Sequence, residues 1–178
     1  MEVQKRKLKS MLHISGLAFM VLGLWSALKG IVDVFLDYRS AIDAEVRNAM
    51  AWDPTFTESD LKMISSIVIF FLIALIVLIL LLFHFLIGRE AMKEAKGKMK
   101  VKGKSQRKGI AYLVLSIIYI IITIISIVMN FLDPSGLSIE EIAEMFFDAT
   151  MIFALVMIVK SAIQLRKIER EERAALAA

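Results

Sequence analysis

A stretch of 26 residues without Asp, Glu, Lys or Arg, from Met63 to Gly88, constrains the fold of this chain more than any other feature. As an α-helix it would be ~39 Å long, whereas the hydrocarbon core of a bilayer is about 30 Å thick. Hydrophobic residues make up 58% of the chain and its mean hydropathy is +0.72, above the roughly 45–50% apolar share of soluble domains. The stretch therefore predicts a transmembrane helix that tilts or projects beyond the lipid.

Three further apolar segments bring the predicted number of transmembrane helices to four. They are expected at about 11–36, 109–132 and 142–165. The first could be the apolar part of a secretory signal, but it is too long and lacks a small-x-small cleavage site, so we interpret it as a retained helix. Capping-box patterns, Thr57 with Asp60 and Ser138 with Glu141, precede the second and fourth helices. The predicted fold class is all-α, a polytopic membrane protein.

The distribution of Lys and Arg predicts the orientation in the membrane. The segments 1–10, 89–108 and 166–178 contain 17 of these residues, whereas 38–62 and 133–141 contain three. Because basic residues remain on the cytoplasmic side, both termini are expected there, in a multi-pass protein of the cell membrane. We expect the 89–108 loop to contact anionic lipid headgroups. Nucleic acid is not an expected partner, since this loop has no interleaved aromatic residues.

Two halves of the chain resemble each other, with GLAFMVLGL at 16–24 answered by GIAYLVLSI at 109–117. We therefore predict two tandem helical hairpins related by a pseudo-twofold axis along the membrane normal. An amphipathic segment at the outer membrane surface is inserted into the first hairpin only, and Asp53-Pro54 is expected to end it. The predicted divisions are an N-terminus at 1–10, a first hairpin at 11–88 with the insertion at 38–52, a basic loop at 89–108, a second hairpin at 109–165 and a helical tail at 166–178.

Small residues recur every seven positions on two of the predicted helices. Seven residues are close to two helical turns, so each set lies on one face, and small residues let helices approach closely in lipid. We predict that these faces pack the two hairpins together. The residues are Gly16, Gly23 and Gly30 on the first helix and Gly109, Ser116 and Thr123 on the third.

Polar residues in the outer halves of the same two helices suggest a second feature. Under the repeat alignment they would face each other and, with one acidic residue of the fourth helix, form an outward-facing, acidic polar pocket. The residues are Ser26, Lys29, Asp33, Asp37, Tyr119, Thr123, Ser126, Asn130 and Asp148. The alternative is a packing seam of interhelical hydrogen bonds and one ion pair.

Signatures of catalysis are missing from the sequence. There is no cysteine, and no HExxH, GxSxG or phosphate-binding glycine loop occurs. The acidic residues Glu141 and Glu144 are explained by the dipole at a helix start without a bound cation. His13 and His84 have no carboxylate neighbour in their own helices, which favours interfacial or hydrogen-bonding roles, and Lys160 can extend toward the cytoplasm. We predict no catalytic residues, no cofactor and no metal.

These observations favour a non-enzymatic four-helix membrane protein that acts by association. It would be a homo-oligomer or a small subunit of a larger membrane complex, because the sequence is rich in packing features and poor in chemical groups. The alternative is a small transporter or channel that uses the outer polar pocket between the first and third helices.

Overall fold

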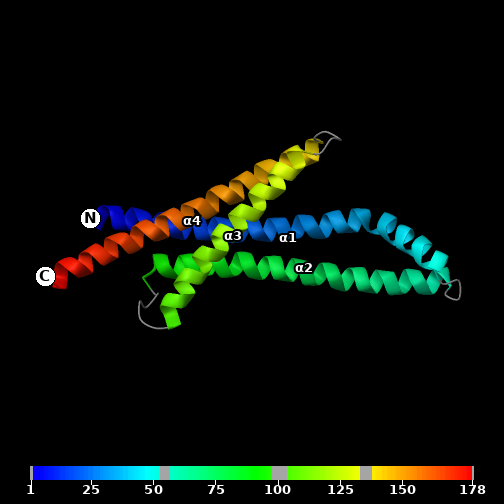
Figure 1. Cartoon of the computed structure of the whole chain (residues 1–178), viewed down its shortest axis with the longest axis horizontal. Helices are drawn as coiled ribbons and strands as arrows, with labels where there is room; N and C mark the ends of the chain where they lie inside the picture. Colours follow the sequence, from blue (N-terminus) through cyan, green and yellow to red (C-terminus); the bar gives the residue numbers. More distant parts are fainter. Residues whose placement is uncertain (1, 53–56, 98–103, 133–137, 178) are drawn as a thin grey trace. The chain divides into compact units, whose positions relative to one another are not determined.

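The computed structural model describes residues 2–52, 57–97, 104–132 and 138–177, and within these ranges it describes no side chains at 33–41, 45, 49–52, 58, 104–109, 140 and 177. Every described element is an α-helix (Figure 1). The four helices are α1 (Glu2–Trp52), α2 (Glu58–Ala95), α3 (Lys104–Phe131) and α4 (Ile139–Ala177). Each contains a segment long and apolar enough to cross a membrane. The predicted all-α class with four such helices is confirmed.

Local hydrogen bonds account for two of the described helix ends, and a glycine conformation accounts for a third. At the start of α4, the Glu141 amide donates to the Ser138 hydroxyl (3.1 Å) and the Ser138 amide donates to the Glu141 carboxylate (2.6 Å). This is the reciprocal pattern of a capping box. At the start of α2, the Asp60 amide donates to the Thr57 hydroxyl at 3.3 Å. At the end of α2, Gly97 has a φ of 67°, the left-handed conformation that commonly stops a helix.

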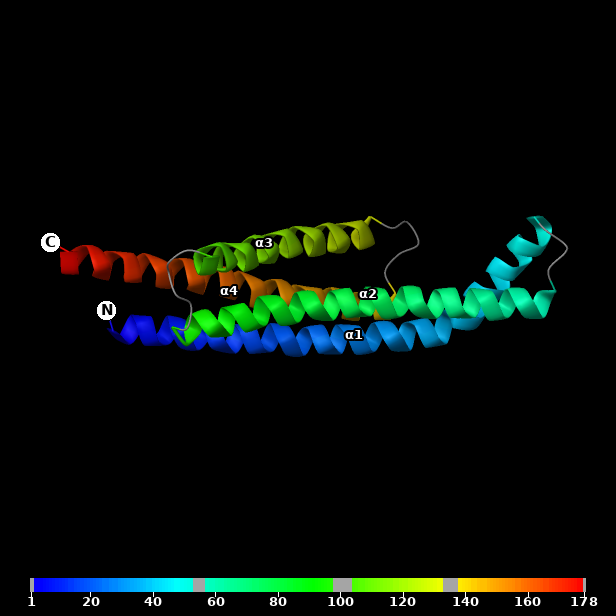
Figure 2. The same ribbon diagram turned by 90° about the horizontal axis from the view of Figure 1, so that it is seen from below.

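The first helix is longer than the sequence suggests. Helix α1 includes residues 2–10 and also 38–52, which the sequence predicts as a separate amphipathic segment. No proline or glycine lies between Ile31 and Trp52 to stop the helix. Figure 2 shows the last part of α1, in cyan, turning away from the direction of the preceding turns. Asp53-Pro54, which is predicted to end this segment, lies outside the described residues.

The chain forms two compact units. The first contains Met1–Leu22 and His84–Ala178, and the second contains Gly23–Phe83. In the first unit, the N-terminal part of α1, the C-terminal part of α2, α3 and α4 share one buried core. Its fully buried apolar residues include Leu12, Phe19, Ile87, Tyr112, Leu155 and Ile158. This core positions the candidate site described below.

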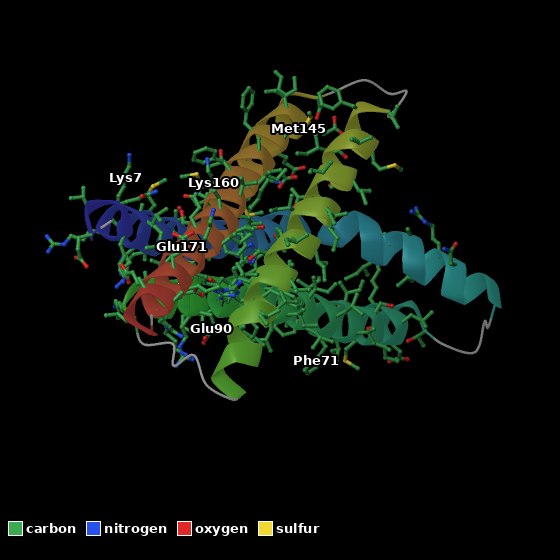
Figure 3. The ribbon with its side chains drawn as sticks, turned by 60° about the vertical axis from the view of Figure 1, so that its left-hand side comes forward. Lys7, Phe71, Glu90, Met145, Lys160 and Glu171 are labelled. Carbon is green, nitrogen blue, oxygen red and sulfur yellow. The ribbon has the colours of Figure 1, made fainter. Side chains whose placement is uncertain are left out.

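The second unit consists of the remaining parts of α1 and α2. Ile42 and Val46 of α1 are buried, and Lys62 of α2 forms an ion pair with Asp43 of α1 at 3.3 Å. The apolar surface of α2 is otherwise open, since none of the residues in its most apolar 18-residue window is buried. Phe71, labelled in Figure 3, is 68% exposed. Such a surface suits a lipid environment.

Candidate functional site

A buried carboxylate, that of Glu94, is bound by donors from two other helices. Arg166 of α4 donates through Nε to Oε1 and through Nη2 to Oε2, both at 2.6 Å. Tyr112 of α3 donates its hydroxyl to Oε2 at 2.7 Å. Glu94 is 8% exposed and Tyr112 is fully buried. We call these three residues the Glu94 cluster.

The geometry of the Glu94 cluster satisfies the carboxylate. Two parallel N–H···O bonds from a guanidinium are the strongest arrangement that a carboxylate commonly accepts. The Arg166 guanidinium also lies 5.9 Å from the centre of the Tyr112 ring, within the range of a cation–π contact. Because a buried charge is costly unless it is paired and hydrogen-bonded, these contacts explain how Glu94 can lie inside the helix bundle.

The positions of the three residues follow from their helices. Glu94 is in the last turn of α2. Gly97 adopts the left-handed conformation that ends this helix, and the Gly97 amide donates a hydrogen bond to the Glu94 carbonyl at 2.9 Å. A carboxylate is disfavoured by the dipole at a helix C-terminus, and Arg166 offsets this cost. Tyr112 belongs to a face of α3 that continues through Ser116 and Thr123, all buried.

An aromatic group lies further along the same bundle. The His84 ring stacks on Phe19 with centroids 4.6 Å apart, and Tyr119 meets both rings edge-on. The Tyr119 hydroxyl and His84 Nε2 are 3.2 Å apart, a hydrogen bond. The hydrogen-bonding interpretation of His84 agrees with this contact. Lys160 is exposed on α4 (Figure 3).

The small residues predicted to pack the helices have varied surroundings. Gly16 and Gly23 are buried, and a Cβ on Gly16 would lie 2.9 Å from the Gly88 carbonyl oxygen of α2. The Ser116 and Thr123 hydroxyls donate to carbonyls one turn earlier in α3. No described atom lies within 4 Å of a Cβ placed on Gly30. Gly109 is among the residues whose side-chain surroundings are outside the description.

The residues of the predicted polar pocket are divided between the two units. Ser26 and Lys29 belong to the second unit, and the side chains of Asp33 and Asp37 are outside the description. The remaining members belong to the first unit; they are Tyr119, Thr123, Ser126, Asn130 and Asp148. Ser126 is exposed, whereas Asn130 and Asp148 are partly buried. The pocket therefore stays a prediction.

The Glu94 cluster was not identified from the sequence, because residues 89–108 were interpreted as a loop. A signal was present. In the sequence, Ala91 and Ala95 continue the helical spacing of Ile87 past Gly88, and no proline or glycine occurs before Gly97. This pattern places Glu94 on the buried face of a continuing helix, although it does not name Arg166 or Tyr112 as partners.

The described residues contain no group of three or more His, Cys, Asp or Glu side chains that could hold a metal ion. The chemistry of the Glu94 cluster is that of a closed ion pair, with both carboxylate oxygens occupied by protein donors.

Comparison of the chain with protein-family models, with curated proteins and with solved structures finds no match.

Proposed function

We propose that this chain is a non-enzymatic four-helix integral membrane protein that acts by association, as a homo-oligomer or as a small subunit of a membrane complex. The observation that carries the proposal is the exposed apolar surface of α2. Its most apolar window contains no buried residue, whereas the corresponding windows of α1, α3 and α4 are 28%, 17% and 22% buried. A second protein helix can pack on such a surface in place of lipid.

The hydrogen bonding of the buried polar side chains supports the same proposal. Among the described residues, every buried side-chain nitrogen and oxygen has a hydrogen-bond partner. Catalytic and transport sites usually present polar groups to a ligand, but the Ser116 and Thr123 hydroxyls are bonded within α3. These bonds weaken the case for the alternative, a transporter or channel with a polar pocket between α1 and α3.

The proposed topology has both termini on the cytoplasmic side of the cell membrane. An ion pair of 2.5 Å joins Lys5 near the start of α1 to Glu172 near the end of α4, and Figure 2 shows both termini at the same end of the first unit. An even number of membrane crossings requires this arrangement. The excess of basic residues at that end supports the cytoplasmic assignment and a contact of the basic segment 89–108, which includes the end of α2 and the start of α3, with anionic lipid.

The internal repeat remains part of the proposal. Two tandem hairpins related by a pseudo-twofold axis would each begin their second helix in the same way. The capping contacts of Thr57 with Asp60 and of Ser138 with Glu141 stand at these equivalent positions, at the starts of α2 and α4. They support the repeat at the level of local structure.

Native mass spectrometry of the purified full chain, released from a mild detergent over a range of protein concentrations, tests the proposed function. We expect masses of two or more copies, or of one copy with a co-purified membrane protein. A chain that is monomeric at every concentration, and that brings no other protein with it from the membrane, would contradict association.

A further inference from the structure

A positively charged side chain lies on the outward face of α4, inside the apolar segment of this helix. Lys160 is exposed (Figure 3), whereas Ile158 and Ala162 are buried in the core. Because residues three, four and seven positions apart share one face of a helix, Lys160 lies in line with several apolar side chains. These are Phe153, Val156 and Ile163, all exposed. Lys160 therefore faces the surroundings of the bundle and not its core.

A lysine at such a position is unusual in this chain. The apolar segments 63–88 and 109–132 contain no Lys or Arg, and the segment 11–36 contains only Lys29. Charged residues are rare in membrane helices because their charge is costly in hydrocarbon, and those that occur usually have a partner. Arg166 and Glu172 of α4 form ion pairs with other helices, whereas no described residue forms one with Lys160. The position of Lys160 thus favours an anionic partner at the surface of the bundle.

Two further polar residues continue the same face toward the end of α4. Gln164 and Lys167 follow Lys160 by four and seven positions, and both are exposed. At 1.5 Å per residue, the backbones of Lys160 and Lys167 are about 10.5 Å apart along the helix. The long side chain of Lys160 can extend toward the end of the apolar segment, so both ammonium groups can reach one anionic group beside Gln164. Ammonium and amide groups both donate hydrogen bonds to phosphate oxygens.

The order of the groups along this face matches that of a phospholipid. The apolar side chains of Phe153 and Val156 come first, and the polar side chains follow toward the end of the helix, as a headgroup follows its acyl chains. A soluble phosphate would gain nothing from the apolar part of the face. A zwitterionic lipid carries its own cation beside its phosphate, whereas an anionic lipid leaves its negative charge to the lysines. The face is therefore complementary to an anionic phospholipid.

We propose that Lys160, Gln164 and Lys167 bind the headgroup phosphate of one anionic phospholipid, whose acyl chains lie along the apolar face of α4. We call these three residues the α4 lipid site. It is separate from the lipid contact of segment 89–108, because all of its residues belong to α4. The proposal rests on the membrane placement in the proposed function, but not on association, since one copy of the chain contains the whole site.

Lipid binding to the delipidated full chain in a mild detergent tests the α4 lipid site, with native mass spectrometry to count the lipids bound per chain. The probes are phosphatidylglycerol and phosphatidylcholine with identical acyl chains. We expect tighter binding of phosphatidylglycerol, which inorganic phosphate in excess should not displace. Lys160→Gln and Lys167→Gln should each weaken the affinity for phosphatidylglycerol by about 5-fold, and the double variant by roughly 25-fold. The affinity for phosphatidylcholine should change little.

Two variants serve as controls. Arg173→Gln removes one positive charge from an exposed position of the same helix, six residues beyond Lys167, and should leave the affinity for phosphatidylglycerol unchanged. Lys160→Arg/Lys167→Arg retains both positive charges and should retain the preference for phosphatidylglycerol. Circular dichroism should show the helix content of the natural chain in every variant, because all the substituted positions are exposed.

Three results would overturn the proposal. An equal loss of affinity in Arg173→Gln would show that the lipid responds only to the net charge at the end of α4. An unchanged affinity in Lys160→Gln would show that Lys160 does not bind the lipid. Displacement by inorganic phosphate, or an equal loss of phosphatidylcholine binding, would exclude a site for an anionic phospholipid. Because the lipids are counted per chain, each result holds whether the chain is monomeric or associated.

Discussion

Addition of a single methyl group at Gly88 should separate α1 from α2. A Cβ on Gly88 would lie 2.5 Å from the Gly16 carbonyl oxygen, and one on Gly16 would lie 2.9 Å from the Gly88 carbonyl oxygen. Carbon atoms do not approach a backbone oxygen so closely, and a backbone atom cannot move aside as a side chain can. The two helices must therefore move apart in a Gly88→Ala chain.

Two opposing terms determine the size of this effect. Alanine in place of glycine favours a helix by about 1 kcal/mol, whereas overpacking commonly costs about 1–3 kcal/mol. The contact at Gly88 is the closer of the two, so we expect Gly88→Ala to be destabilising by about 1–2 kcal/mol and Gly16→Ala by less. The larger value corresponds to a fall of roughly 4–8 °C in melting temperature.

Thermal unfolding in detergent, followed by circular dichroism, measures the difference. Gly30→Ala is the matched control, because it also replaces a glycine within α1 and its Cβ would meet no described atom within 4 Å. It should leave the melting temperature unchanged or raise it by a few degrees, since only the helix-propensity term applies. A Gly88→Ala chain as stable as the Gly30→Ala chain would refute the close approach of α1 and α2 at Gly16 and Gly88.

Three further substitutions test individual contacts by the same unfolding measurement. Ser138→Ala removes the N-cap of α4 and should destabilise the chain by about 1 kcal/mol, whereas an unchanged stability would mean that this cap contributes nothing. Gly97→Ala forces a side chain into a left-handed conformation and should cost about 1–2 kcal/mol; no cost would show that α2 ends differently. Tyr119→Phe removes the hydrogen bond to His84 and should cost about 1 kcal/mol, while an equal or higher melting temperature would argue against that bond.

Features that depend on neighbouring residues in the chain could be predicted from the sequence. The capping box of Ser138 and Glu141 is an example, because both partners lie within one turn and their spacing alone brings them together. The apolar stretch from Met63 to Gly88 is another, since its length and lack of charge suffice to identify it. The continuation of α1 through residues 38–52 could not be predicted, because a polar sequence without glycine or proline is compatible with both a break and a continuous helix.

Features that depend on tertiary structure were harder to predict. The heptad spacing identified Gly16 as a position of close packing, but spacing within one helix does not reveal the partner, and the contact at Gly88 lies on α2. The Glu94 cluster joins residues 72 positions apart. Glu94 and Arg166 each lie among many charged residues in the sequence, so their pairing cannot be recognised without the packing of α2 against α4.

Single-cysteine crosslinking in the native membrane tests association through α2 most directly. Leu75→Cys on α2 and Ile121→Cys on α3 are matched positions, 55% and 52% exposed in apolar segments, in a chain with no other cysteine. The account predicts that mild oxidation, or a bifunctional thiol reagent, links the Leu75→Cys chain to a second copy or to another membrane protein, and links the Ile121→Cys chain far less. Equal crosslinking at the two positions, or none at Leu75→Cys, would contradict association through the surface of α2.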